Sequence, residues 1–326
     1  ADLIVVAPAT ARVIGSYAAG ISSEFLTATL IATRAPVLVC PAMHTEMWEH
    51  PAVQENIATL RRRGVHILEP ETGRLAGGDV GAGRLAEPQH IFSQIDAMLS
   101  PGDLYGTHVV VTAGGTREPI DAVRVIANRS TGKQGYAIAQ EAALRGAKVT
   151  LITTVDLATP FGVDRVAVET AQQLSDAVMQ VRASADVIVM AAAVADVRPK
   201  HQASHKLKKD PATGEIPGLG AIELEATPDI LAALGAAKEL HQVVVGFAAE
   251  TENLVAHAQM KLERKGADLI VANDVSQAGV GFAHDTNAVT LVSRGSQPVE
   301  VVLADKRSIA RSVLDAVVAI RSARTN

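Results

Sequence analysis

The segment 108–136, HVVVTAGGTREPIDAVRVIANRSTGKQGY, constrains the fold more than any other part of the sequence. It opens with a β-branched run, breaks at Gly114-Gly115, and offers a second small-residue turn at Ser130-Thr131-Gly132 before a helical pattern begins. A strand that leads through glycines into a helix brings backbone N–H groups and the positive end of the helix dipole to one place. The segment therefore predicts an α/β domain with an anion site at this turn.

Short apolar strands alternate with helical stretches along the whole chain, which predicts βαβ units and parallel sheets. Before residue 100 we expect strands at 3–7, 37–40 and 66–68 and helices at 9–34, 52–63 and 88–99. Beyond it we expect strands at 108–112, 148–153, 187–190, 243–246 and 269–272 and helices at 132–145, 171–182, 228–236 and 254–265. Strands at 287–292 and 299–303 and a helix at 306–322 predict an antiparallel edge hairpin and a closing helix.

The best linker candidate is Ser100-Pro101-Gly102-Asp103, since it breaks helix and sheet at once. A chain of 326 residues is long for one domain, so we expect domains at 1–100 and 105–326 with a linker at 101–104. The chain starts at Ala1 and enters an apolar strand directly. We therefore expect an incomplete first domain whose true N-terminus lies upstream. The polar segment 201–215 predicts a loop or flap.

Composition restricts the partners. Aromatic residues make up only 3% of the chain and the net charge is −5 without a long basic run, which argues against a nucleic-acid partner. No apolar run reaches the roughly 18 residues of a membrane span, and no signal peptide is visible. The single cysteine, Cys40, excludes a disulfide framework. We therefore expect a cytoplasmic protein without a membrane partner.

Several polar residues stand where an α/β protein binds ligands. Gly114, Gly115 and the 130–132 turn are the candidate phosphate cradle, although glycines there can also serve packing alone. Asn128 offers both a donor and an acceptor for an acyl group, or is a turn asparagine bonded to its own backbone. Asp196 and Arg198 follow a buried strand and mark a ligand site or a solvated strand exit.

Lysines form two further groups. Lys206 opens a KLKK run, which by itself is more often solvated charge than a functional group. Lys261 and Lys265 stand at i, i+4 on one predicted helix face, where they can reach the same anion or simply face water.

Together these segments resemble bacterial phosphopantothenate-cysteine ligase, the second half of the bifunctional decarboxylase and ligase of coenzyme A synthesis. The resemblance runs over residues 104–322 and rests on GGTREPID and VIANRSTGKQG, AAAVAD at 191–196, KLKK at 206–209, TPDI at 227–230, GFAAET at 246–251, ANDV at 272–275 and Gly281-Phe282. It implies a Rossmann-like fold and a two-step reaction. The carboxylate of phosphopantothenate attacks the α-phosphate of CTP and releases pyrophosphate, and the amine of L-cysteine then displaces CMP from the acyl-cytidylate.

The resemblance also implies roles for individual residues. Asn128 would hold the acyl-cytidylate, Lys206 would stabilise the departing pyrophosphate, and Arg124 would contact the substrate phosphate. Asp196 is the one candidate to touch the Mg²⁺ that accompanies CTP. The substrate or its phosphate would meet Asn128, Ser130, Thr131 and Gly132. The predicted nucleotide contacts are Gly114, Gly115, Ala191, Ala192, Ala193, Asp196, Lys206, Thr227, Pro228, Asp229, Ile230, Phe247, Lys261 and Lys265.

The first domain resembles the flavin-dependent phosphopantothenoylcysteine decarboxylase. APATA at 7–11 is similar to that family's PASANT motif, PAMHTEMW at 41–48 to its PxMNxxMW motif, and residues 73–88 to its substrate-covering flap. The resemblance implies part of a flavodoxin-like fold and FMN as cofactor. The residues matched to substrate or flavin contacts are Pro8, Ala9, Thr10, Met43 and His44.

Three departures bear on decarboxylation. The family's catalytic histidine would lie before Ala1, Gly77 occupies the usual position of the proton-donating cysteine, and Arg12 and His44 replace the two motif asparagines. We expect Cys40 to be a buried small hydrophobe rather than the missing donor. This domain is therefore not expected to decarboxylate as it stands, whereas decarboxylation by a complete chain stays open.

Two other functions compete. A nicotinamide-dependent reductase would need a GxGxxG fingerprint, which is missing, although Asp156 follows a predicted strand. A non-catalytic nucleotide-binding subunit fits the first domain better than the second. The family implies a homodimer through the ligase domain and a dodecamer for the complete chain. Residue types and spacings leave the choice between CTP and ATP open.

Overall fold

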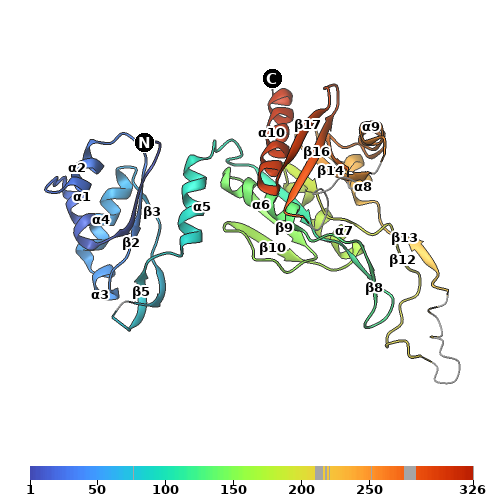
Figure 1. Cartoon of the computed structure of the whole chain (residues 1–326), viewed down its shortest axis with the longest axis horizontal. Coiled ribbons are helices and arrows are strands. Elements are labelled where there is room, and N and C mark those ends of the chain that lie inside the picture. The colour runs from blue at the N-terminus through green and yellow to red at the C-terminus, as the bar shows by residue number, and fades with distance from the viewer. Residues whose placement is uncertain are drawn as a thin grey trace. The chain divides into compact units, whose positions relative to one another are not determined.

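A computed structural model describes residues 1–75, 77–209, 216, 219, 221–250, 252–274 and 284–325. The chain divides into two compact units, Ala1–Pro101 and Gly102–Asn326, each with its own hydrophobic core (Figure 1). The motif residues Thr251, Val275, Gly281 and Phe282, and most of the predicted flap beyond residue 209, lie outside the described residues. In the described part of the chain, no helix is both long and apolar enough to cross a membrane.

The first unit contains a parallel sheet in the order β1-β2-β3. Its core joins Val6, Ile14, Leu30, Val39 and Ile57 from the sheet and the helices around it. The strands are β1 (Ile4–Ala9), β2 (Val37–Pro41) and β3 (His66–Ile67), with a separate hairpin of β4 (Glu71–Arg74) and β5 (Val80–Arg84). The helices are α1 (Ala11–Ala19), α2 (Phe25–Ala32), α3 (Thr45–Trp48), α4 (Pro51–Arg62) and α5 (Pro88–Leu99).

The single helix predicted at 9–34 is wrong, because the structure has two helices there. Gly20 adopts a left-handed conformation (φ 74°), and its N–H donates to the carbonyls of Ser16 and Tyr17, which ends α1. The β4–β5 hairpin was not predicted, since its glycine-rich strands lack an alternating apolar pattern.

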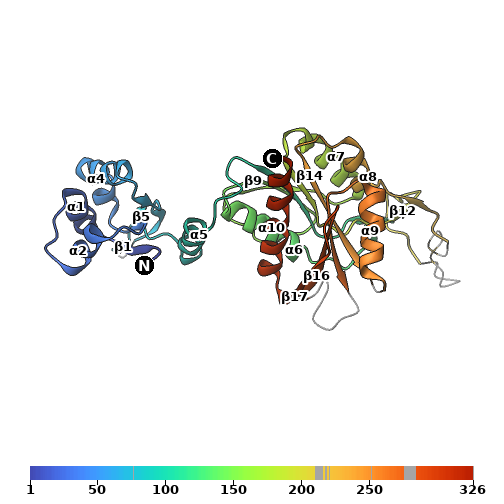
Figure 2. The same cartoon turned by 90° about the horizontal axis from the view of Figure 1, so that it is seen from above.

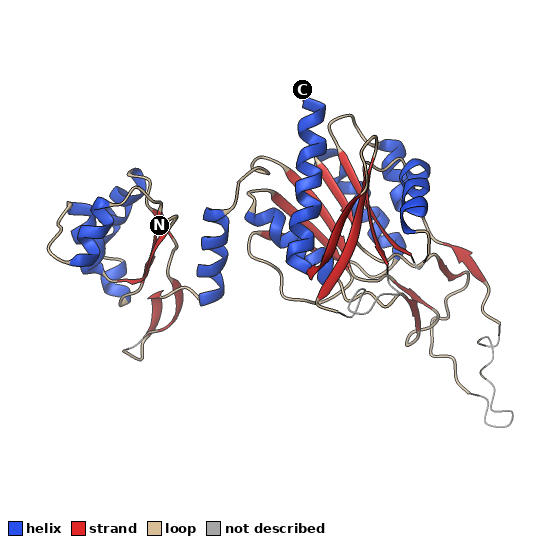
Figure 3. Ribbon diagram, turned by 45° about the horizontal axis from the view of Figure 1, so that its top comes forward, coloured by secondary structure: helices blue, strands red, loops and turns tan. Residues whose placement is uncertain are grey.

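The second unit is built on one large sheet (Figure 3). In the described residues its strands run in the order β10-β9-β6-β11-β14-β15-β16-β17. β16 and β17 are antiparallel and the strands before them are parallel, which confirms the predicted α/β fold and its antiparallel edge hairpin. The strands are β6 (His108–Ala113), β9 (Lys148–Thr153), β10 (Val163–Ala167), β11 (Val187–Met190), β14 (Val243–Glu250), β15 (Leu269–Asp274), β16 (Thr286–Ser293) and β17 (Val299–Asp305).

Helices cover both faces of this sheet (Figure 2). The helices α6 (Lys133–Leu144) and α10 (Lys306–Thr325) pack on one face, and α7 (Ala171–Val181), α8 (Ile230–Ala237) and α9 (Leu254–Lys265) pack on the other. Alternate residues of each strand point to opposite faces. Val109 and Val111 therefore join the core under α6 and α10, while Val110 joins the core under α7 and α8.

Two short antiparallel pairs interrupt the regular order. β7 (Arg117–Pro119) pairs with β8 (Val125–Ala127), and β12 (Val197–Pro199) pairs with β13 (Leu224–Ala226). Strands of three residues are too short to show a period in the sequence, and we did not predict them. They follow the carboxyl ends of β6 and β11.

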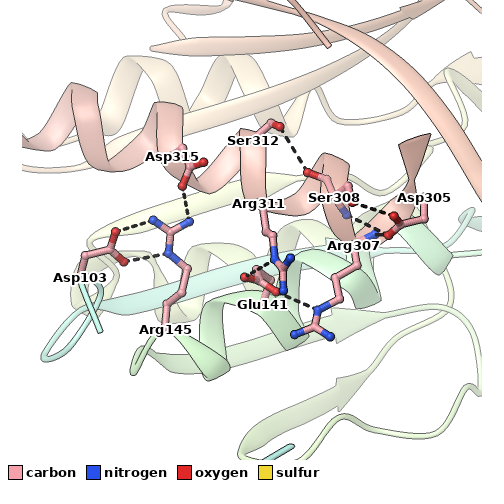
Figure 4. A network of polar contacts seen from close by, with 9 residues as sticks. All are labelled: Asp103, Glu141, Arg145, Asp305, Arg307, Ser308, Arg311, Ser312 and Asp315. Carbon is pink, nitrogen blue, oxygen red and sulfur yellow. Dashed lines mark hydrogen bonds and ion pairs between the residues drawn. The ribbon is translucent and has the colours of Figure 1, made fainter. Parts of the chain in front are cut away.

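Ion pairs hold α6 and α10 side by side (Figure 4). Near the start of both helices the Gln134 side chain donates to the Lys306 carbonyl (3.0 Å), and further along the Arg145 guanidinium donates to Asp315 (2.7 Å). Between them the buried Glu141 accepts from two arginines of α10. The two helices therefore run parallel, with adjacent N-termini.

Candidate functional site

A cavity of about 890 Å³ lies at the carboxyl ends of β11, β14 and β15, beside the N-terminus of α6. This is the edge where open parallel sheets bind ligands. Fifteen of the predicted residues line it: Asn128, Ser130, Thr131, Gly132, Ala191, Ala192, Ala193, Asp196, Thr227, Pro228, Asp229, Ile230, Phe247, Lys261 and Lys265. The structure thus gathers residues that lie up to 137 positions apart in the chain around one space.

The loop after β11 forms one wall, and backbone hydrogen bonds to the loop after β6 hold it in place. The Ala193 N–H donates to the Gly114 carbonyl (2.8 Å), and the Ala195 N–H donates to Thr116 Oγ1 (2.9 Å). Asn128 Nδ2 donates to the Val194 carbonyl (3.0 Å). This bond orients the Asn128 amide against the loop after β11. The small alanine side chains of that loop let a ligand come close to its backbone.

Gly114 and Gly115 do not line the cavity. Gly114 has a φ of 91°, and a Cβ there would lie 2.2 Å from Thr154 Oγ1. At Gly115 a Cβ would lie 2.7 Å from the carbonyl oxygen of Asn128. In this structure Gly114 leaves room for Thr154 after β9, and Gly115 allows the Asn128 loop to approach the end of β6. Gly132 (φ 77°) does line the cavity, at the N-terminus of α6.

Charged groups from α8 and α9 meet at another part of the wall. Lys261 Nζ donates to the Phe247 carbonyl (2.8 Å), and Lys265 forms an ion pair with Asp229. Burial lowers the pKa of Lys261, and the neighbouring Lys265 lowers it further, against the opposing effect of Glu250. A bound anion would offset this cost of holding a buried ammonium.

Arg124 and Lys206 also lie outside the cavity lining. Arg124 donates to the carboxylate of Asp121 (2.7 Å) and to the Leu207 carbonyl (3.2 Å), and Asp121 accepts from the Leu207 N–H (3.2 Å). Arg124 and Asp121 therefore anchor the Lys206 segment to the turn between β7 and β8. The predicted phosphate contacts of Arg124 and Lys206 stay predictions.

Sequence reasoning missed several polar residues of the lining. Lys133 stands directly after the predicted cradle and could have been inferred from that position. Asn287 and Lys306 belong to β16 and α10, whose sequences look like an ordinary edge strand and an ordinary helix start. The polar residues that we did not predict are Arg129, Lys133, Gln134, Asn273, Asn287 and Lys306.

At the predicted magnesium position, Asp196 supplies a single carboxylate. Among the described residues, Asp196 does not belong to any cluster of three or more histidine, cysteine or carboxylate side chains that could hold a metal ion. Mg²⁺ is commonly held by one or two carboxylates together with phosphate oxygens and water. The cavity therefore fits a magnesium ion that arrives with a nucleotide.

In the first unit, the two sequence motifs meet at one edge of the sheet. Ala9 and Pro41 are paired at the ends of β1 and β2, which brings residues 8–10 and 43–44 to the carboxyl edge. Thr10 caps α1 there by accepting from the Val13 N–H. An α/β edge with an adjacent helix N-terminus fits a flavin phosphate.

The β4–β5 hairpin packs directly against the second motif. The Met43 N–H donates to the Gly83 carbonyl (2.9 Å), and Thr45 Oγ1 donates to the Ala82 carbonyl (2.8 Å). A Cβ at Gly77 would lie 2.7 Å from His44 Cε1 and 2.7 Å from Asp79 Oδ1. His44 and Asp79 thus occupy the space that a cysteine side chain would need at position 77.

Cys40 lies within β2 and is fully buried. Burial raises the pKa of its thiol, which disfavours the thiolate. Its position agrees with a packing role.

The fold and the cavity together define a two-unit α/β protein whose second unit carries a polar, lysine-containing cavity at the carboxyl edge of its sheet. Residues 104–320 match the family of the DNA/pantothenate metabolism flavoprotein C-terminal domain, and residues 1–100 match the Flavoprotein family. The second match spans the first unit and does not support our expectation that this domain is incomplete.

Relatives and solved structures agree with these matches. The coenzyme A biosynthesis bifunctional protein CoaBC of Mycobacterium tuberculosis is 49% identical over 334 residues, covering 98% of this chain and 78% of the relative. The CoaBC protein of Bacillus subtilis is 44% identical over 325 residues, covering 98% of this chain and 78% of the relative. The crystal structure of a CoaBC C-terminal domain has a TM-score of 0.56 and 39% identity, covering 67% of this chain and 97% of that one. The chain belongs to the CoaBC family.

Proposed function

We propose that the second unit ligates phosphopantothenate to L-cysteine with CTP, through a phosphopantothenoyl-cytidylate. The observation that carries this proposal is the convergence of Asn128, the 130–132 turn, the 191–196 loop and the Lys261–Lys265 pair on one cavity. A ligase of this kind needs a phosphate cradle, cations for the leaving pyrophosphate and a group that positions the acyl carbonyl. The cavity offers each of these.

In the first step, the carboxylate of phosphopantothenate attacks the α-phosphate and pyrophosphate leaves. The backbone N–H groups at the start of α6 would bind phosphate oxygens, and Mg²⁺ bound through Asp196 would supply a second positive charge. Lys206 would approach the triphosphate from the segment that Asp121 and Arg124 anchor. In the second step, the cysteine amine displaces CMP while Asn128 holds the acyl group.

Pyrophosphate release tests this proposal. The purified chain is incubated with phosphopantothenate, Mg²⁺ and L-cysteine, and with CTP or ATP, and each component is omitted in turn. We expect release that requires phosphopantothenate and is faster with CTP. The absence of release with both nucleotides, from folded protein, would favour a non-catalytic nucleotide-binding subunit.

Asn128→Asp tests the second step separately. This change keeps the shape of the side chain but removes the Nδ2 donor that bonds to the Val194 carbonyl. We expect the acyl-cytidylate to accumulate, detected by mass spectrometry of the quenched reaction. Full turnover to phosphopantothenoylcysteine by this variant would remove Asn128 from its proposed role.

Contrary to our expectation from the sequence, we extend the proposal to the first unit, which would decarboxylate the ligase product with FMN supplying the redox chemistry. Pro8, Ala9 and Thr10 would hold the flavin, and Met43 and His44 would face the substrate under the β4–β5 hairpin. The match of residues 1–100 to the Flavoprotein family supports this assignment. Loading the chain with FMN and measuring carbon dioxide release from phosphopantothenoylcysteine tests it, and a loaded chain without release would contradict it.

We also propose that the ligase unit forms a homodimer. Val299, Val302 and Leu303 of the edge strand β17 are all more than half exposed, and exposed apolar edge strands tend to pair with another chain. Light scattering should give twice the chain mass, and replacement of Val302 by Lys should produce the monomer.

A further inference from the structure

The cavity has two chemically different ends, which lie toward opposite faces of the sheet. The α8–α9 end contains Asp229, Lys261 and Lys265, where the nucleotide contacts were predicted. The α6–α10 end contains Lys133, from the first turn of α6, and Lys306, from the first turn of α10. No role has yet been assigned to the side chains of the α6–α10 end.

Two parallel helices direct their N-termini toward this second end. The bond from the Gln134 side chain to the Lys306 carbonyl fixes the two first turns beside each other. Each N-terminus contributes a partial positive charge. At α10 the Lys306 N–H donates to the Asp285 carbonyl, and the N–H groups of Arg307 and Ser308 donate to the Asp305 carboxylate, so α10 contributes its dipole and the Lys306 side chain. The side chains there add positive charge to a place that the backbone already makes favourable for an anion.

The side chains at this end are buried hydrogen-bond donors. Lys306 is 8% exposed and Asn287 is 4% exposed, and both line the cavity. Asn287 Oδ1 accepts from the Ala288 N–H (3.1 Å), and within the described part of the chain its Nδ2 has no hydrogen-bond partner. Asn287 lines the cavity, so a ligand bound there can accept from this donor.

The electrostatics of this end favour an anionic ligand. Burial lowers the pKa of Lys306, and Lys133 lowers it further, against the opposing effect of Asp285. Lys133 is paired with Asp285 (2.6 Å), whose side chain is 85% exposed. An exposed ion pair contributes little to stability, so Lys133 can exchange Asp285 for a ligand at small cost.

We propose that Lys133, Asn287 and Lys306 form a phosphate-binding subsite at the α6–α10 end of the cavity, separate from the Lys261–Lys265 end. The identity of the ligands of this subsite rests on the proposed ligase function. Two substrates carry the required chemistry, the triphosphate of CTP and the phosphate ester of phosphopantothenate. An ammonium–phosphate hydrogen bond is charge-assisted, so the loss of one should weaken binding about tenfold or more.

Titration calorimetry tests the subsite, with Lys306→Met and Asn287→Asp compared to wild type. Lys306→Met keeps the length of the side chain without its charge, and Asn287→Asp replaces the Nδ2 donor with a negative charge. Lys148→Met is the matched control, since Lys148 is exposed at the start of β9 and lies outside the cavity lining. The probes are pyrophosphate, CTP, CMP, phosphopantothenate and pantothenate.

We expect both variants to bind pyrophosphate at least tenfold more weakly, while Lys148→Met binds as wild type does. If the subsite takes the triphosphate, CTP binding falls and CMP binding does not. If it takes the substrate phosphate, phosphopantothenate binding falls and pantothenate binding does not. Unchanged binding of pyrophosphate, CTP and phosphopantothenate by both variants would overturn the subsite.

Two further measurements keep the test decisive. If Lys306→Met does not fold, Lys133→Met takes its place, because the Lys133 side chain is 41% exposed and its removal perturbs the core less. Lys306→Arg should restore pyrophosphate binding, which a purely structural role would not require. A wild-type chain that binds pyrophosphate but neither CTP nor phosphopantothenate would refute the proposed ligase while leaving the subsite supported.

Discussion

Gly135→Ala should damage the site through a clash between α6 and β6. A Cβ at this position of α6 would lie 2.6 Å from the Ala113 Cβ and 2.8 Å from the Thr112 carbonyl oxygen at the end of β6. Carbon atoms in contact are about 3.5–4.0 Å apart, so the start of α6 must move outward by about 1 Å. That turn carries Gly132 and Lys133, and a displacement of about 1 Å can cost roughly 10²-fold in rate.

The effect on stability is smaller, because two terms oppose each other. Overpacking costs about 1–3 kcal/mol, and the better helix propensity of alanine offsets about 1 kcal/mol of it. We expect a net loss of about 1 kcal/mol, which lowers the melting temperature of a unit this size by roughly 2–4 °C.

Thermal unfolding and pyrophosphate release measure the two effects on the same protein. Gly15→Ala is the control, since it adds a Cβ in the middle of α1 whose nearest atom is 3.5 Å away. It should keep wild-type pyrophosphate release. If Gly135→Ala retained both the wild-type melting temperature and the wild-type rate, the close approach of α6 to β6 would not be what positions the cradle.

Three further substitutions have defined outcomes. Arg145→Met should lower the free energy of unfolding in urea by about 3 kcal/mol. This is the lower end of the loss expected when one partner of a buried ion pair is removed, because Asp103 and Asp315 reach solvent. A loss below about 1 kcal/mol would contradict this prediction. Burial opposes the ionisation of Asp121, but backbone N–H donors and Arg124 outweigh it and lower its pKa to about 2, below the roughly 3.9 of an unfolded chain. Its stabilising effect is therefore present above about pH 4 and lost as the pH falls toward 2, and Asp121→Asn should flatten that part of the curve of urea midpoint against pH. Lys206→Gln should slow pyrophosphate release by no more than about 10³-fold, and an unchanged rate would make the KLKK segment ordinary surface.

The sequence predicted those parts of the fold that repeat a pattern over many residues. The strands at 148–153 and 187–190 and the helix at 254–265 have the predicted bounds, because buried parallel strands and amphipathic helices of this length show clear periods. The break after α1 was missed although the sequence marks it, since Gly20 is a typical helix-ending residue and Ser22-Ser23 interrupt the helical pattern.

The site was predictable where the chemistry is contiguous in the chain. The 130–132 turn and the 191–196 loop could be placed from their own sequence, because each follows a strand or precedes a helix at the ligand-binding edge. Asn287 and Lys306 could not, since the pairing of β16 with β15 brings the first to the cavity and the packing of α10 against α6 brings the second. No local spacing relates them to Lys133, which lies more than 150 positions earlier.

Three glycines near the site, Gly114, Gly115 and Gly135, act through close packing of the backbone. A glycine motif after a strand marks the right place for a ligand, yet here a Cβ at each of the three would meet protein atoms at 2.2–2.7 Å. Gly114 leaves room for Thr154 after β9, Gly115 lets the Asn128 loop approach the end of β6, and Gly135 lets α6 approach β6, and these close approaches shape the cavity wall. Substitution of these glycines should therefore weaken the binding of every phosphate ligand together, whereas substitution of Lys306 should weaken either CTP but not CMP, or phosphopantothenate but not pantothenate.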